Sequence, residues 1–168
     1  SLIFVISNKK TKHQAFTLIE LLVVVAIIGI LAAVGVVAYN GYTSGAKKTV
    51  AKSNHQTAVK FIKLKLHECG FNENISLKST ANSSTVNSIS CNTGTGKMGL
   101  YLSNHLNNEG FKNPYNMSQK AFTDTGYVVG QTWFGAAGNT GITFFNIITK
   151  IDENSSNNLL TTFDDPRD

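Results

Sequence analysis

A continuous apolar run near the N-terminus constrains this chain more than any other feature. From Leu21 to Ala38 every residue is apolar or glycine. As a helix rising 1.5 Å per residue, this run would be about 27 Å long, close to the roughly 30 Å hydrocarbon core of a bilayer. Phe16, Leu18 and Ile19 extend the run toward the N-terminus, with Thr17 between them. We therefore predict a membrane-spanning helix over residues 16–38.

One acidic residue, Glu20, falls inside the predicted span. A carboxylate at the edge of the bilayer core costs several kcal/mol unless it finds a partner. No cation stands at helical spacing from it, because positions 16, 17, 23 and 24 are Phe, Thr, Val and Val. A signal anchor or a cleaved secretory signal would not explain Glu20, and secretory apolar regions of roughly 7–15 residues are shorter than this run. We expect its partner to come from elsewhere, and a free α-amino group at a new N-terminus on a neighbouring copy would supply one.

Basic residues lie directly before the apolar run. Lys9, Lys10 and Lys12 stand in the first fifteen positions, which contain no acid. Such a positive flank predicts a single-pass orientation with the N-terminus in the cytoplasm. Without these fifteen positions the formal net charge falls from +5 to +2, that is, 12 basic minus 10 acidic residues. A general attraction for nucleic acid therefore mostly disappears, and nucleic acid is not favoured as a partner, although it is not excluded.

The junction between the basic flank and the apolar run carries a specific pattern. It reads Lys9-Lys10-x-Lys12-His13-Gln14-Ala15, followed by Phe16-Thr17-Leu18-Ile19-Glu20-Leu21-Leu22-Val23-Val24-Val25-Ala26-Ile27-Ile28-Gly29-Ile30-Leu31-Ala32-Ala33. This pattern closely resembles the N-terminus of type IV pilin and pseudopilin precursors, in particular the type IVa prepilins with N-methylphenylalanine. The resemblance implies that a prepilin peptidase removes a leader, residues 1–15, by cutting between Ala15 and Phe16. It also implies that the new Phe16 amine is methylated, and that Glu20 pairs with the Phe16 amine of an adjacent subunit.

The resemblance further implies partners and a location. A subunit of this family waits in the inner membrane as a single-pass protein and assembles with its own copies into a helical filament. An assembly platform protein and an ATPase take part in addition to the prepilin peptidase. The product is an extracellular pilus or, for a pseudopilin, a short filament in the periplasm.

Two positions depart from the family pattern. Ala15 stands where the family strongly prefers glycine before the cut, and its small side chain keeps cleavage plausible. Val37 stands where many type IVa pilins have a proline that kinks the helix. Glycines at Gly29, Gly35, Gly41 and Gly45 offer weak points instead, because each costs a helix about 1 kcal/mol relative to alanine. We predict that the helix bends or unwinds locally near residues 35–45 in an assembled filament.

The helix is predicted to continue through an amphipathic half, residues 39–69. Apolar side chains recur on one stripe at helical spacing: Ala51, Ala58, Val59, Ile62, Leu66 and Cys69. Lys60 and Lys63 fall on the other side, as expected for a solvated face, although acidic lipid, nucleic acid or acids of a neighbouring copy would also suit them. Gly70 is expected to cap the helix.

The remaining residues, 70–168, are predicted to form a globular head, which makes the chain α+β. Short runs rich in β-branched and aromatic residues predict antiparallel strands within 121–163, in a small sheet packed on the long helix; the resemblance implies that this is the pilin fold. Gly/Asn-rich connections are expected at 135–141 and 154–158, and a short helix at 98–108. The large apolar residues of the strands are expected to be core rather than a ligand-binding platform: Val128, Trp133, Phe144 and Ile148.

A polar stretch at 72–97 is predicted to be a surface loop, because it is dense in Asn, Ser and Thr. The two cysteines are Cys69, at the predicted helix end, and Cys91, inside this stretch. An even cysteine count in an exported chain favours one disulfide between them, while two buried reduced thiols remain the alternative.

Catalytic and metal-binding patterns are weak. The histidines, His13, His55, His67 and His105, form no motif with Ser or Cys that is typical of a nucleophile. The pair Asp164-Asp165 is expected to be a solvated tail, and the acids of the C-terminal region show no regular calcium-ligand spacing. We therefore expect no enzyme activity, no cofactor and no metal.

The function predicted from these features is that of a structural filament subunit. Two alternatives stay open: a pseudopilin of type II secretion, and a membrane-tethered domain for DNA uptake or adhesion that acts alone.

Overall fold

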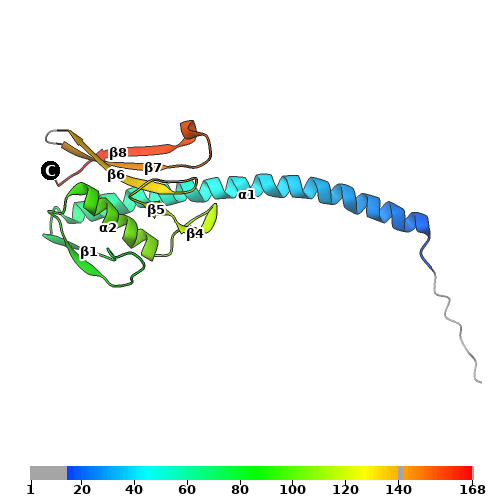
Figure 1. Ribbon diagram of the computed structural model, residues 1–168, viewed down its shortest axis with the longest axis horizontal. Helices are drawn as coiled ribbons and strands as arrows, with labels where there is room; N and C mark the ends of the chain where they lie inside the picture. Colours follow the sequence, from blue (N-terminus) through cyan, green and yellow to red (C-terminus); the bar gives the residue numbers. More distant parts are fainter. Residues whose placement is uncertain (1–14, 140–141, 168) are drawn as a thin grey trace, which may run out of the picture. The chain divides into compact units, whose positions relative to one another are not determined.

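The computed structural model describes residues 15–139 and 142–167. The chain divides into two compact units, Ser1–Tyr42 (unit 1) and Thr43–Asp168 (unit 2), and each is described by itself. Figure 1 labels the helices and strands. The predicted leader, 1–15, lies outside the described residues except for Ala15.

A long helix, α1, runs from Leu18 to Glu68 (Figure 1). This confirms the predicted long N-terminal helix. It is unbroken at Gly29, Gly35 and Gly41, and the boundary between the two units directly follows Tyr42. The predicted flexibility at these glycines concerns the assembled filament and stays a prediction.

The end of α1 is closed by a tight turn rather than by a left-handed glycine. The amides of Gly70 and Phe71 donate to the carbonyls of His67 and Glu68 at 3.0 and 3.1 Å. The helix ends just before Gly70, as predicted, although Gly70 has no positive φ. Gly110, which follows the second helix, has φ +95° and takes that conformation instead.

In unit 2 one stripe of α1 is buried, as its periodicity predicted. Ala51, Ala58, Ile62 and Leu66 are at most 1% exposed. Two polar residues, Asn54 and His55, share this stripe. The stripe packs into a core that also contains side chains of the sheet and of the second helix.

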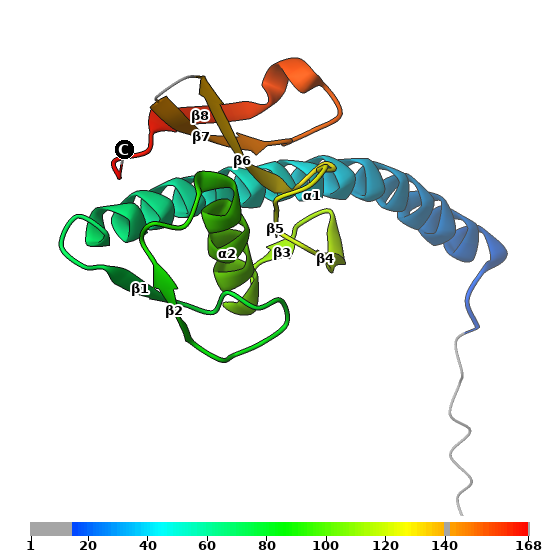
Figure 2. The same cartoon turned by 60° about the vertical axis from the view of Figure 1, so that its left-hand side comes forward.

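Beyond α1, unit 2 consists of short elements in chain order: β1 (Asn74–Leu77), β2 (Asn87–Ser90), α2 (Thr95–Asn108), β3 (Lys112–Asn113), β4 (Asn116–Lys120), β5 (Phe122–Thr123), β6 (Thr132–Asn139), β7 (Ile142–Thr149), η1 (Ser155–Asn157) and β8 (Leu159–Asp164). They form two antiparallel two-stranded sheets, β1–β2 and β3–β4, and one four-stranded sheet in the order β5-β6-β7-β8. In Figures 1 and 2 strands β6–β8 lie on one side of the C-terminal half of α1, and β1 lies on the other. The α+β class is confirmed.

The four-stranded sheet is antiparallel from β6 to β8, but its short edge strand β5 pairs with β6 in parallel. This corrects the expectation of a purely antiparallel sheet within 121–163. Gly135–Asn139, which was expected to be a loop, belongs to β6 and pairs with β7. Pairing with the apolar β7 holds these small residues in a strand, although their own β-propensity is low.

The strands bury the opposite face from the one expected. Phe134, Phe145 and Ile147 are at most 3% exposed and lie in the core. Their predicted counterparts point the other way: Val128 is 47% exposed, and Trp133, Phe144 and Ile148 are only partly buried. Successive residues of a strand face opposite sides of the sheet. A prediction that is off by one residue therefore exchanges all buried and exposed side chains of the strand.

The predicted surface loop at 72–97 was also wrong, because it contains the hairpin β1–β2 and the start of α2. Ile75, Leu77 and Ile89 alternate with polar residues and point into the core. Two or three apolar residues at period two are enough to bury one face of a short strand, and the surrounding Asn and Ser hid that signal.

Candidate functional site

The start of α1 holds the residues on which the sequence predictions depend most. Ala15 and Phe16 precede the helix, are exposed and have no regular secondary structure. Thr17 is the residue directly before the first helical position, and Glu20 is the third residue of the helix. The predicted cut would therefore fall in an exposed, non-helical segment.

Thr17 and Glu20 form a reciprocal capping box. The Thr17 backbone amide and hydroxyl both donate to Glu20 Oε2, at 2.8 and 2.6 Å. In return, the Glu20 amide donates to the Thr17 hydroxyl at 3.3 Å. The carbonyl of Thr17 accepts the first helical hydrogen bond, from the Leu21 amide at 3.2 Å.

This box corrects the expectation that Glu20 has no partner within its own segment. The segment has no cation at helical spacing from Glu20, but Thr17 and Glu20 form the pattern Thr-x-x-Glu, which is a known signature of a helix start. The stabilisation from this box is small: an N-cap contributes about 1 kcal/mol, whereas an unpaired carboxylate at the edge of the bilayer core costs several kcal/mol. The capping box alone therefore does not offset the cost that a carboxylate has at the edge of a bilayer core.

The apolar side chains of unit 1 are exposed along the helix. Phe16 is 83% exposed, and Leu31 and Val37 are 66% and 74% exposed. Glu20 is the one charged residue within 15–42. By length and composition α1 meets the requirements for crossing a membrane near the N-terminus of the chain. These features fit a helix that is anchored in a membrane.

A comparison with family models identifies residues 10–36 as the prokaryotic N-terminal methylation motif. The chain carries the signature of type IV pilin and pseudopilin prepilins. This prepilin motif includes the exposed junction, the capping box and most of the apolar helix. No solved structure was found to match the chain.

The motif implies pilin-type assembly and processing by a prepilin peptidase in general terms. Proteins of this family are structural rather than enzymatic. The motif and the apolar helix together fit anchoring in a membrane and a place in a pilus or pseudopilus.

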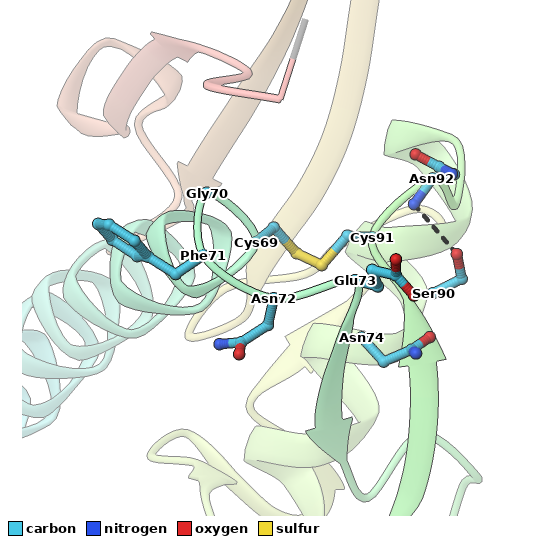
Figure 3. A pocket seen from close by; sticks show the side chains of 9 residues that line it. All are labelled: Cys69, Gly70, Phe71, Asn72, Glu73, Asn74, Ser90, Cys91 and Asn92. Atoms are coloured by element: carbon cyan, nitrogen blue, oxygen red, sulfur yellow. Dashed lines mark hydrogen bonds between the residues drawn. A yellow bond between two sulfur atoms is a disulfide. The ribbon is translucent and has the colours of Figure 1, made fainter.

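A disulfide ties the end of α1 to the segment after β2. Cys69 and Cys91 are bonded with their Cα atoms 5.5 Å apart, as the cysteine count favoured. Figure 3 shows the bridge beside a shallow pocket of about 600 Å³ whose other labelled residues include Asn72, Glu73 and Asn92. Closing a loop of 22 residues is worth about 3 kcal/mol in the chain-entropy model.

The imidazole of His55 connects α1 to two strands. Its Nδ1 and Nε2 lie 2.8 Å from the hydroxyls of Thr149 and Thr161, and Thr149 is also hydrogen-bonded to Thr132 at 2.6 Å. Burial lowers the pKa of His55. Burial also lowers the pKa of His105, whose Nδ1 accepts from the Lys78 amide at 2.9 Å. Both side chains therefore act as neutral structural groups.

The C-terminal residues are clamped rather than solvated, which corrects the expectation for Asp164-Asp165. Asp165 is 4% exposed, forms an ion pair with Arg167 and accepts from the Thr95 hydroxyl at 2.9 Å. Burial alone would raise the pKa of Asp165, but the hydrogen bonds from Arg167 and Thr95 outweigh it and lower that pKa. Arg167 Nη1 also donates to the carbonyls of Cys91 and Thr93, at 2.9 and 2.8 Å. Asp164 remains exposed.

Metal-binding groups do not gather in the part of the chain that the structure describes. No set of three or more His, Cys, Asp and Glu side chains there has the arrangement of a metal site. Asp152 is engaged by Lys48 Nζ at 2.9 Å, which lowers the pKa of Asp152 and raises that of Lys48. This pair joins α1 to the segment after β7.

Proposed function

We propose that the chain is the precursor of a structural subunit of a type IV pilus-like filament. Residues 16–38 insert in the inner membrane, and a prepilin peptidase cuts between Ala15 and Phe16 and methylates the new amine. Glu20 then pairs with the Phe16 amine of the neighbouring subunit while the apolar helices bury one another. An assembly ATPase and a platform protein drive the process.

One observation carries this proposal: residues 15–42 form an exposed apolar segment whose single charge, Glu20, has only the Thr17 cap as a described partner. A helix that only had to anchor a head would be more stable in the membrane with an apolar residue at this position. A neighbour's amine offers a full positive charge at the matching depth. The carboxylate therefore gives successive subunits a defined register.

The intact mass of the purified chain tests the processing step. We expect a mature chain that begins at Phe16 with one added methyl group. A chain that keeps its leader, or one cut near Ala38, would contradict the proposal. Ala15 in place of glycine is expected to slow the cut without preventing it, and Ala15→Gly should speed it.

Replacing the assembly carboxylate tests the polymerisation step. Glu20→Ala should leave cleavage and membrane insertion intact and abolish filaments, as seen by electron microscopy of cell surfaces. Thr17→Ser is the matched control, because it keeps the capping hydroxyl next to the same cut. Filaments that persist unchanged in Glu20→Ala would show that the pairing mechanism is wrong.

The neighbouring genes distinguish a pilus subunit from a pseudopilus subunit. A retraction ATPase gene nearby points to a pilus, whereas an outer-membrane secretin with several pseudopilins points to type II secretion. A tethered DNA-uptake or adhesion domain would instead show a processed chain that never polymerises.

A further inference from the structure

The outer face of the four-stranded sheet carries an apolar row. The strand register aligns Trp133, Ile148 and Leu160 across β6, β7 and β8. These residues alternate with the buried ones, so they lie on the face away from the core. Leu160 is 64% exposed. Contiguous apolar side chains on the outside of a soluble head indicate an interaction surface.

Trp133 lies flat against its own strand. A Cβ on Gly135 would lie 1.8 Å from the Trp133 ring, so the indole covers the position where a side chain would stand. The indole N–H donates to the carbonyl of Asp124 at 3.2 Å, and the Tyr127 ring lies 6.2 Å from it. These contacts hold the Trp133 indole against the outer face of the sheet.

Two exposed acids, Asp124 and Asp164, lie on or beside this outer face. The Asp124 carbonyl accepts from the Trp133 indole, and Asp164 lies on the same side of β8 as Leu160. Lys150 and Glu153 pair with each other at 3.5 Å, so the two remaining carboxylates give this face a net charge of −2. A face of this sign repels phosphate backbones, although the whole chain has a net charge of +5.

The exposed side of α1 in unit 2 has the opposite charge. Lys52, Lys60 and Lys63 are exposed and fall within about 80° of one another at 100° per residue. Residues 43–67 contain no acid, and none of the three lysines is in an ion pair within the described residues. Lys63 Nζ lies 5.1 Å from the centroid of the Phe163 ring of the same copy, so Lys63 is at the edge of this face nearest β8. Leu64, which is 60% exposed, lies beside them.

We propose that the acid-rimmed row of one copy docks on the Lys52–Leu64 face of α1 in a second copy. The faces complement each other in charge and each offers apolar area at its centre, as in protein interfaces with an apolar core and a polar rim. Because the two faces differ, the contact is head-to-tail and repeats from copy to copy without self-pairing. It thus adds a second contact, between heads, to the filament proposed above, and it rests on that proposed function.

Cysteine cross-linking in assembled full-length chains tests the contact. The native cysteines are already joined to each other, so new thiols can be introduced at Lys60→Cys and Leu160→Cys and treated with a short bifunctional thiol reagent. We expect the double variant to give a ladder of dimers, trimers and longer species. Each single variant should give no covalently cross-linked species. Lys60→Cys with Val86→Cys, an exposed residue far from the row in the sequence, is the matched control and should give no ladder.

The outcomes separate this contact from the proposed function. Filaments without a ladder in the double variant would overturn the contact and leave the filament proposal standing. Dimers from Leu160→Cys alone would overturn it too, because they require two sheets face to face. A wild-type chain that is processed but never polymerises would remove the filament proposal and this contact together.

A charge reversal supplies an independent readout. Lys60→Glu should sharply reduce filament number, and adding Asp164→Lys should recover a measurable part of it if the two residues face each other. An unchanged filament number in Lys60→Glu would contradict the contact.

Discussion

Unit 1 and unit 2 use apolar residues in opposite ways. In unit 1 the apolar residues follow one another without interruption and are exposed all around the helix; Ile30 is 65% exposed. In unit 2 they recur at helical spacing and face inward, and Ile62 is fully buried. The same helix therefore needs an outside partner in one unit and supplies its own core in the other. The two parts of the helix differ both in how many apolar residues they contain and in how these residues are spaced.

The largest effect should come from removing a buried apolar side chain in unit 2. Ile62→Ala should cost about 2–5 kcal/mol of unfolding free energy, because it leaves a cavity in a closely packed core. The measurement is the loss of head structure with denaturant in detergent solution. Ile30→Ala is the matched control in unit 1 and should leave that transition unchanged. If both substitutions lowered the unfolding free energy equally, the proposed difference between unit 1 and unit 2 would be wrong.

The disulfide should rank next. Cys69→Ser with Cys91→Ser should lower the unfolding free energy of the head by about 3 kcal/mol. The midpoint of denaturation reports this, and a reducing agent should give the same shift in the unmodified chain. No shift in either case would mean that the bridge does not constrain the unfolded state.

Mild acid should then weaken unit 2 through its buried histidines. The folded state lowers the pKa of His55 and His105, while their unfolded pKa stays near the usual value of about 6.5. As pH falls below this value the unfolded chain takes up protons first, so stability falls until the folded pKa values are passed. Stability measured between pH 7 and 5 should decrease, and His55→Gln should flatten part of that slope. A flat profile in the unmodified chain would contradict the neutral imidazole network.

The acidic residues with lowered pKa should act in a separate, more acidic window. Asp165 and Asp152 have folded pKa values below their usual ones, so their contribution is complete at neutral pH and is lost as pH falls below about 4. Asp165→Asn should remove part of the acid transition and leave the slope between pH 7 and 5 unchanged.

The smallest effect should come from the capping box in unit 1. Thr17→Val removes the hydroxyl that links it to Glu20 and should cost about 1 kcal/mol at the helix start. Hydrogen exchange of the amides at residues 18–21 should accelerate in Thr17→Val and stay slow in Thr17→Ser. Similar rates in both variants would show that the box is not formed in the membrane.

The sequence predicted the features that follow from local periodicity. The long helix, its buried stripe at Ala58 and Ile62, the helix at 98–108 and the disulfide partners all follow from spacing and from the export context. The functional prediction also came from local residues, since the methylation motif is continuous in the chain.

Features that depend on long-range pairing were missed. Which face of β6 and β7 is buried could not be predicted from residues 132–149, because both faces of these strands carry apolar side chains. The burial of Asp165 depends on Arg167 and Thr95, and the latter lies 70 residues away. The role of His55 likewise depends on two threonines from distant strands. Hydrogen-bond partners that lie far apart in the sequence cannot be predicted from a local sequence pattern.

The attachments along α1 have a mechanical consequence. Lys48, His55 and Cys69 connect it to the rest of unit 2 through an ion pair, an imidazole bridge and a covalent bond in turn. A tensile force along the helix axis would load the first two in shear, and both can break and re-form. The disulfide at the far end also ties the end of α1 to the segment after β2, so oxidised heads should stay packed against their helices under loads that unfold reduced ones.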